Sequence, residues 1–152
     1  MITIKILCVG NLKEKFWTEA CEEYIKRLGR FCKVKVEELA EQNKYDSIDK
    51  IIAEEGKEIV AKLEGYSFLL DINGKMITSE DLAYDIKEKA MSNSTLTFVI
   101  GGSYGVSKEV KEKIPSKISF GRVTYPHNLA RVILLEQVYR AFMINGGGKY
   151  HK

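Results

Sequence analysis

The feature that most constrains the fold is an alternation of strand-like and helix-like segments along the chain. Residues 2–9 alternate and then become β-rich, as in a strand that stops at Gly10, and residues 16–28 carry apolar side chains at helical spacing up to Gly29. The pattern repeats, with strands expected at 32–39, 66–72 and 96–100 and helices between Ser47 and Gly65 and between Ser79 and Asn93. This order predicts an α/β domain whose mostly parallel sheet is sandwiched by helices.

Length and composition predict one domain that covers residues 1–152. The chain has 45% hydrophobic and 30% charged residues and only two prolines, which is typical of a compact soluble protein. No apolar run approaches the roughly 20 residues that span a bilayer. The first ten residues are too short an apolar run for a secretory signal. Three cysteines without a CxxC pair suggest a reducing compartment, so we expect a cytoplasmic protein.

Three predicted strand ends form the candidate ligand site, because ligands of such sheets bind beyond the carboxyl ends of the strands. These ends are Leu70-Asp71, Ile100-Gly101 and Phe120-Gly121, and the first of them runs into a turn signal at 71–74, Asp-Ile-Asn-Gly. The second end leads into the sequence GGSYG at 101–105, after which Ser107 can cap a helix. Adjacent glycines let a backbone approach a ligand closely, but they also suit a tight turn without any ligand. The GGxxG spacing matches neither a P-loop nor the GxGxxG dinucleotide motif.

The segment 125–128, Tyr-Pro-His-Asn, is expected to enter the last helix. Pro126 favours an extended residue before it, and Asn128 can cap the helix predicted from Leu129 to about Ile144. That helix is apolar nearly all round, so every side of it requires burial. One face can pack on the sheet and the other on a second copy of the chain, which predicts a homodimer. Within this helix Glu136 and Arg140 have the spacing of an ordinary ion pair.

His127 is the most interesting side chain of this segment. A histidine in a loop is more often a hydrogen-bonded structural residue than a catalyst, and the sequence leaves both readings open. Arg131 follows one helical turn later and could face the same site. With two histidines in the chain and no cluster of cysteine and carboxylate ligands, a metal site has little support.

The end of the chain is basic and follows three glycines. Residues 113–152 contain seven Lys and Arg residues against one Glu, which suits either a solvated surface or a site for nucleic acid. After Gly146–Gly148, the last four residues form a mobile tail unless contacts hold them. Alternatively Tyr150 stacks or hydrogen-bonds at the active site while His151 and Lys152 meet phosphate.

Several segments together resemble one known family. The chain is similar to the RlmH family of small SPOUT-class methyltransferases across nearly all of its length. The resemblance is carried by the segments VGNLKEKFW (9–17), EYIKRLGRF (23–31), LLDINGK (69–75), FVIGGSYGV (98–106), SFGRVTYPHNLARVILLEQVYRAF (119–142) and KYHK (149–152). The resemblance implies a homodimer with a C-terminal trefoil knot within about residues 70–152. Without the resemblance a knot would not be expected, because threaded chains are nearly absent from proteins.

The same resemblance implies an activity and a set of site residues. The family transfers a methyl group from S-adenosylmethionine to N3 of a pseudouridine in 23S ribosomal RNA, with assembled ribosomes as substrate. Candidate catalytic residues are His127, Arg131, Tyr150 and His151, with the tail acting in its own chain or across the dimer. Implied contacts to the methyl donor are Leu70, Gly101, Phe120, Gly121, Arg122, Val123, Thr124 and Tyr125.

Two alternative functions are also compatible with this sequence. One is a SPOUT methyltransferase that acts on another ribosomal RNA base or on transfer RNA. The other is a dimer that binds nucleotides or RNA without catalysis and uses the same glycine loop. Neither membrane nor metal partners are expected.

Overall fold

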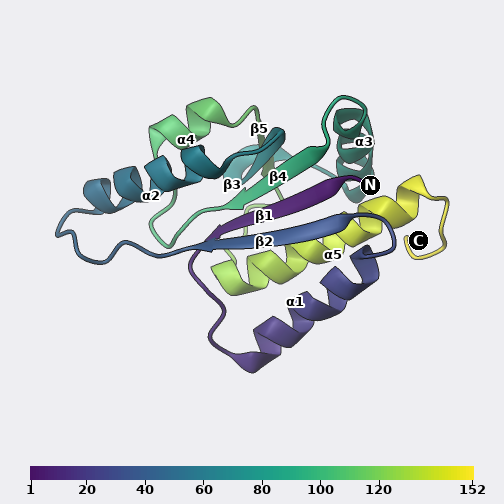
Figure 1. Ribbon diagram of the computed structural model, residues 1–152, viewed down its shortest axis with the longest axis horizontal. Helices are drawn as coiled ribbons and strands as arrows, with labels where there is room; N and C mark the ends of the chain where they lie inside the picture. Colours follow the sequence, from purple (N-terminus) through teal and green to yellow (C-terminus); the bar gives the residue numbers. More distant parts are fainter.

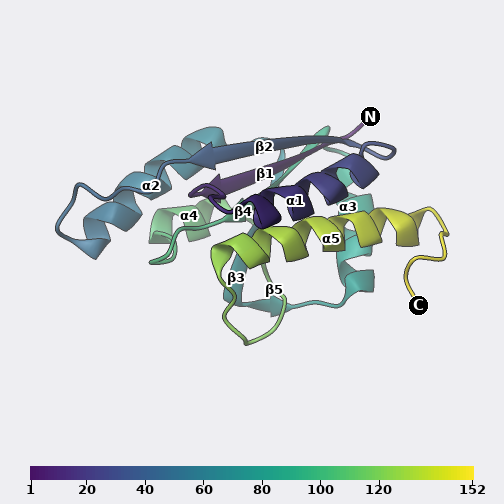
Figure 2. The same ribbon diagram turned by 90° about the horizontal axis from the view of Figure 1, so that it is seen from below.

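A computed structural model describes all residues, 1–152, and contains a five-stranded parallel sheet with helices on both faces (Figures 1 and 2). The predicted α/β architecture is therefore confirmed. None of the helices combines the length and the hydrophobicity that a membrane crossing requires. The elements in chain order are β1 (Thr3–Val9), α1 (Lys15–Leu28), β2 (Lys33–Leu39), α2 (Ile48–Lys62), β3 (Tyr66–Met76), α3 (Ser79–Ala90), β4 (Thr95–Ile100), α4 (Lys108–Lys113), β5 (Ser116–Ser119) and α5 (His127–Asn145).

The strands lie in the order β2-β1-β4-β3-β5, so β2 and β5 are the two edge strands. Strand β1 lies between β2 and β4, and it pairs with β2 from Thr3 opposite Lys33 and with β4 from Thr3 opposite Thr95. Because all strands run parallel, the carboxyl ends of β3, β4 and β5 lie at one edge of the sheet. This arrangement brings together the three strand ends that the sequence singled out.

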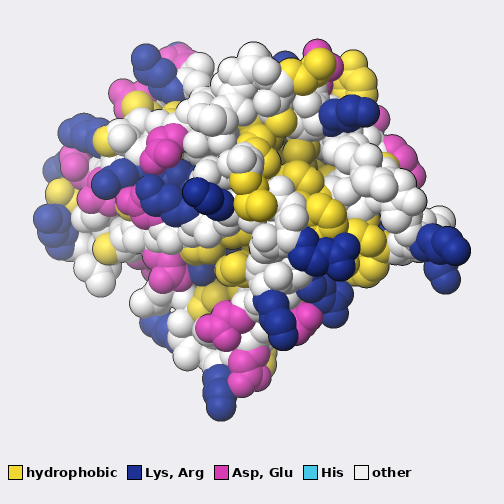
Figure 3. Space-filling model, turned by 45° about the vertical axis from the view of Figure 1, so that its right-hand side comes forward, with side chains coloured by type: hydrophobic (Ala, Val, Ile, Leu, Met, Phe, Trp, Pro, Cys, Tyr) yellow, Lys and Arg dark blue, Asp and Glu magenta, His cyan; other side chains and the backbone are white.

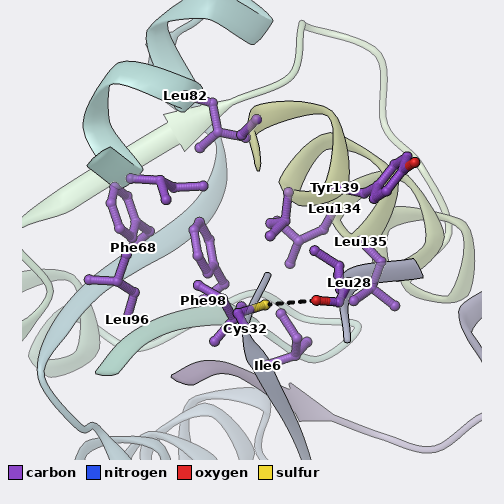
Figure 4. Close-up of a cluster of buried hydrophobic side chains, with 14 of the residues drawn as sticks. Ile6, Leu28, Cys32, Phe68, Leu82, Leu96, Phe98, Leu134, Leu135 and Tyr139 are labelled. Atoms are coloured by element: carbon purple, nitrogen blue, oxygen red, sulfur yellow. Dashed lines mark hydrogen bonds between the residues drawn. The ribbon is translucent and has the colours of Figure 1, made fainter. Parts of the chain in front are cut away.

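Alternation along the strands divides the interior into two cores. Side chains such as Ile6, Phe68 and Phe98 point to the face covered by α1, α3 and α5, where the rings of Phe68 and Phe98 stack with centroids 4.6 Å apart (Figure 4). Side chains such as Leu7 and Val99 point to the opposite face, which α2 and α4 cover. Burial on both faces explains why the central strands are nearly continuous apolar runs.

Strand β3 is longer than predicted. The turn expected at residues 71–74 is present, but pairing resumes beyond it, since Leu70 and Lys75 both pair with Ile118. The residues between them form a bulge, in which the Asp71 carboxylate accepts a hydrogen bond from the Asn73 backbone N–H at 2.9 Å. The turn signal was correct, whereas the prediction that the strand ends there was wrong.

One of the two helix caps predicted from the sequence is present in the structure. Ser107 caps α4 as predicted, because its hydroxyl accepts from the Val110 backbone N–H at 3.2 Å. Ser47 occupies the cap position of α2 without a side-chain hydrogen bond, and Thr78 caps α3 in a capping box with Asp81. Asn128 is not a cap, since α5 begins at His127, two residues before the predicted start, and Pro126 occupies its cap position.

Helix α5 is buried on one side only within a single chain. Leu134, Leu135 and Val138 have no exposed surface and pack against the sheet, α1 and α3. Ile133 and Phe142 lie on parts of the helix that remain partly exposed. The expectation of burial on every side is therefore not met by one chain. The predicted ion pair is present, with Arg140 Nε 2.8 Å from Glu136 Oε1.

Candidate active site at the ends of three strands

A cavity of about 610 Å³ lies at the carboxyl ends of β3, β4 and β5 and at the start of α5. All three strand ends named from the sequence contribute to its wall, together with the segment that leads into α5. Its size is that of a small-molecule or cofactor site. The lining residues include Leu70, Asp71, Ile100, Gly101, Gly102, Phe120, Gly121, Val123, Thr124, Tyr125 and His127.

The glycine loop forms one wall, and its conformation requires two of its glycines. A Cβ atom on Gly101 would lie 2.4 Å from Val106 Cγ1, so only glycine fits there. Gly105 has a φ of +89°, which side chains rarely adopt, and its backbone N–H donates to the Gly102 carbonyl at 3.0 Å. The loop is thus a closed turn whose backbone faces the cavity.

The segment 119–125 forms the opposite wall and is tied to the bulge of β3. Ser119 Oγ donates to the Ile72 carbonyl at 3.2 Å, and the Arg122 guanidinium donates to the same carbonyl. Arg122 itself is exposed and does not line the cavity. Of the eight residues expected to contact a ligand here, Arg122 alone lies outside the lining, and its side chain joins two loops of the wall instead.

His127 is the candidate catalytic residue that lines the cavity. Its ring lies against the turn after β1, since a Cβ atom on Gly10 would be 3.2 Å from His127 Cε1 and 3.1 Å from Glu41 Oε1. The imidazole and a carboxylate therefore approach the same glycine, whose φ is +103°. Because His127 is the first residue of α5, its side chain lies at the edge of the sheet where the strands end.

Arg131 does not face the cavity. It is 3% exposed, and its guanidinium donates to Glu38 Oε2 at 2.7 Å and to the Gly10 carbonyl at 3.3 Å. Its place one helical turn after His127 was read correctly from the sequence, but its side chain points toward the ends of β1 and β2. Arg131 supports the turn on which His127 rests.

Tyr150 and His151 lie at the far end of α5, a helix roughly 27 Å long from its first to its last residue. Contacts hold the tail in place, so the mobile end, one of the two alternatives left open by the sequence, is not observed. Tyr150 packs edge-on against Tyr139 with centroids 4.9 Å apart, and the Arg140 guanidinium lies 4.8 Å from the Tyr150 ring centroid. His151 Nε2 is 2.6 Å from Glu80 Oε1 on α3. Burial, with Glu136 and Tyr24 nearby, raises the pKa of Tyr150.

Charged side chains on this part of the surface are mixed in sign. Figure 3 shows Lys and Arg side chains beside a band of hydrophobic ones, with acidic side chains among them. Two of the cations in residues 113–152 are also paired, because Arg131 Nη1 lies 2.7 Å from Glu38 Oε2 and Arg140 pairs with Glu136. The positive excess in the sequence is therefore partly neutralised by neighbouring carboxylates.

Several lining residues were not predicted. Ile72 and Asn73 reach the cavity because the bulge of β3 carries them outward, and Lys111 does so from α4. A turn signal marked the first two positions, but it gave no indication of a ligand. Glu38 and Glu41, which lie near His127 and Arg131 outside the lining, gave no signal either, since acidic residues in and after an edge strand are ordinary surface features.

A model of one protein family matches residues 2–151, and its description is "Predicted SPOUT methyltransferase". The chain belongs to the SPOUT methyltransferase family. Among its relatives, the Ribosomal RNA large subunit methyltransferase H of Oenococcus oeni is 46% identical over 100% of both chains. The proteins of that name from Carboxydothermus hydrogenoformans and Clostridium novyi are 45% and 46% identical, covering 98% and 99% of this chain and 99% and 100% of theirs.

One similar solved structure is the A. aeolicus TrmH/SpoU tRNA modifying enzyme. It is 15% identical, with a TM-score of 0.47, and the match covers 94% of this chain and 77% of that chain.

A SPOUT methyltransferase requires a methyl donor, and the cavity has features that suit one. Backbone of three loops lines it beside apolar side chains such as Leu70 and Phe120, and its charged side chains are Asp71 and Lys111. Such a wall accepts a flat, partly apolar molecule and offers backbone hydrogen bonds to its polar edges. No group of three or more His, Cys, Asp or Glu side chains is placed to hold a metal ion.

Proposed function

We propose that this chain is an S-adenosylmethionine-dependent methyltransferase that modifies N3 of a pseudouridine in 23S ribosomal RNA within assembled ribosomes. The observation that carries the proposal is a cavity built from three strand ends, with His127 in its wall, in a SPOUT chain that matches proteins named Ribosomal RNA large subunit methyltransferase H over their whole length. An enzyme that acts on bacterial ribosomes works in the cytoplasm.

The donor is proposed to lie against the glycine loop and the segment 119–125. Leu70 and Phe120 pack on its adenine ring, and backbone groups from Gly101 and from residues 121–125 bond to its polar edges. Bound there, the donor supplies an electrophilic methyl group on a sulfonium. The contribution of Arg122 is to fasten this segment to the bulge of β3. Holding donor and acceptor in line is a large part of such catalysis.

His127 is proposed to receive the proton that leaves N3. Of the four catalytic candidates it alone lines the cavity of its own chain. A positioned base contributes roughly 10²- to 10⁴-fold to a rate. His127→Ala should therefore lower kcat by at least about 100-fold and leave donor affinity within a few-fold. Arg131 is proposed to hold the turn against which His127 lies.

A two-fold homodimer is proposed, in which the partly exposed face of α5 is covered by a second copy. Antiparallel packing of two α5 helices would place the tail of one chain near the cavity of the other. Tyr150 and His151 would then contact the target nucleotide across the dimer. The C-terminal trefoil knot expected for the family is proposed for the segment 70–152.

The test uses ribosomes from a strain that lacks this protein, purified protein and S-adenosylmethionine with a labelled methyl group. The expected result is one added methyl on one 23S pseudouridine, located by mass mapping, with short naked RNA a poor substrate. The His127→Ala variant is the matched control for activity from contaminants. Label in another ribosomal base or in transfer RNA would overturn the substrate, and RNA binding without donor binding would overturn the activity.

A further inference from the structure

Glu55, on α2, is a buried carboxylate directly behind the glycine loop. The residue is 4% exposed, and its Oε2 atom accepts a hydrogen bond from the Gln42 backbone N–H at 3.0 Å. On the other side, a Cβ atom added to Gly102 would lie 2.8 Å from Glu55 Oε1. Gly102 lines the cavity. The carboxylate is therefore separated from the cavity by one layer of backbone.

The next residue of α2 supports the other end of the same loop. A Cβ atom on Gly56 would lie 2.4 Å from the hydroxyl oxygen of Ser107, which caps α4. Both ends of the loop 101–107 thus rest on two consecutive residues of one helix. This close packing fixes the position of the Glu55 carboxylate relative to the cavity wall.

The charge of Glu55 is not explained by the stability of the fold. No cation pairs with it in the chain, in contrast to the other buried charges, Lys5 and Arg131. Burial raises its pKa, the Gln42 N–H opposes this, and the nearby carboxylates Glu41 and Glu58 raise the pKa further. Burying an ionised group in such surroundings is unfavourable. An apolar or amide side chain would fill the same space at a lower cost in stability.

We infer that Glu55 is a specificity-determining residue, which makes the cavity bind S-adenosylmethionine in preference to its demethylated product, S-adenosylhomocysteine. The inference rests on the proposed function, in which the donor carries a sulfonium. On transfer, the S–CH3 bond breaks, a C–N bond forms, sulfur keeps the electron pair and becomes a neutral thioether, and the N3 proton leaves to the base. The negative charge behind Gly102 favours the cationic donor over this uncharged product. The product therefore leaves more readily and the donor replaces it.

The expected size of this preference follows from Coulomb's law. If the carboxylate and the sulfonium on the two sides of the loop backbone are taken to be about 8 Å apart, their interaction at an effective dielectric constant of roughly 20 to 40 changes a binding constant by about 5- to 30-fold. The interaction acts on the sulfonium and not on the adenosine, which both ligands share. Its signature is therefore a change in the ratio of two affinities.

The test is calorimetric titration of the full-length protein and of Glu55→Gln with S-adenosylmethionine and with S-adenosylhomocysteine. Glutamine keeps the shape and still accepts from the Gln42 N–H, so the variant should bind the donor about 5- to 30-fold more weakly and the product within about twofold of the parent. Glu55→Asp, which keeps the charge, should preserve most of the preference. Asp49→Asn, on the same helix but exposed, is the matched control and should change neither affinity.

The outcomes separate the inference from the proposal beneath it. The inference is overturned if the ratio of the two affinities is unchanged in Glu55→Gln. An equal loss of both affinities would show that the role of Glu55 is purely structural. If the parent protein binds neither ligand, the proposed function fails instead. Thermal denaturation at pH 7 provides a second readout, because removing an unpaired buried charge should leave the melting temperature of Glu55→Gln unchanged or raise it.

Discussion

The guanidinium of Arg131 donates a 2.7 Å hydrogen bond to the carboxylate of Glu38, a residue 93 positions earlier in the chain. The bond joins the first turns of α5 to the end of β2, and a second bond to the Gly10 carbonyl includes the end of β1. The two partners differ in exposure, since the side chain of Arg131 is 4% exposed and that of Glu38 is 39% exposed. Loss of either partner therefore leaves a different group unpaired.

This asymmetry predicts unequal effects on stability. Glu38→Ala leaves a buried guanidinium without its carboxylate and should lower the free energy of unfolding by about 3 kcal/mol. Arg131→Met fills the buried space with an apolar chain and leaves Glu38 at the solvent, so its cost should be less than about 1.5 kcal/mol. Urea unfolding followed by circular dichroism measures both. Equal losses would contradict the account.

The contact between Gly101 and Val106 predicts a specific pair of effects. Gly101→Ala places a methyl group 2.4 Å from Val106 Cγ1, so the loop must shift and donor affinity should fall at least tenfold, the equivalent of about 1.4 kcal/mol. Val106→Ala removes the obstructing atom, and the double variant should regain part of the affinity in calorimetric titration. If the double variant is no better than Gly101→Ala, the loss has another cause.

Gly105→Ala is the matched comparison in the same loop. Nothing lies within 4 Å of its added methyl group, but the φ of +89° is strained for alanine. We expect a loss of about 1 kcal/mol in unfolding free energy, measured in urea, without the rescue by Val106→Ala. A fall in stability as large as that of a core truncation would contradict this expectation.

The buried cysteines should be unreactive in the folded protein. Burial raises the pKa of Cys8 and of Cys32 to about 12 each, with Arg131 partly opposing the shift at Cys8. At pH 8 only about one thiol in 10⁴ is then ionised, and the thiolate is the reactive form. Intact mass after iodoacetamide treatment should show no modification of either residue until urea unfolds the chain. Modification of Cys8 in native buffer would contradict this picture.

The contact between His151 and Glu80 predicts how the tail responds to substitution and to pH. The hydrogen bond from His151, followed by a backbone hydrogen bond, lowers the pKa of Glu80. The contact therefore adds stability at pH values above the ordinary carboxyl pKa and loses it as the pH falls through the lowered one. Glu80→Gln should free the tail and speed tryptic cleavage after Lys149 several-fold at pH 7.5.

Glu88→Gln, on the same helix and away from the tail, serves as the control for tryptic cleavage and should leave the rate unchanged. The pH arm is followed by the ring resonances of Tyr150, which should move toward unstructured values only in acid. An unchanged cleavage rate in Glu80→Gln would show that Tyr150 packing alone holds the tail.

Local patterns predicted the architecture well because the fold follows from them. Strand and helix periodicities differ, and a parallel sheet necessarily brings the ends of β3, β4 and β5 to one edge, so Leu70, Gly101 and Phe120 were correctly expected to meet. Helix starts were harder, because Thr78 and Ser79 are both good caps and the choice depends on Asp81 three residues after Thr78.

Contacts between distant parts of the chain could not be predicted from local sequence patterns. The sequence gives the spacing of His127 and Arg131 on α5 but not the carboxylate that turns Arg131 away from the cavity. The tail contacts Glu80, 71 residues earlier, so a glycine run that looked mobile is followed by a held segment. Glu55 was likewise invisible, because its significance depends on Gly102 lying against it.

The bulge of β3 allows the number of residues in this strand to change without a change in the register of the sheet. Ile118 is the pairing partner of both Leu70 and Lys75, so the four residues between them belong to no ladder. Insertions or deletions at 71–74 would change the rim of the cavity without moving one strand past another. This segment is where a lineage could remodel its ligand site while the rest of the protein stays the same.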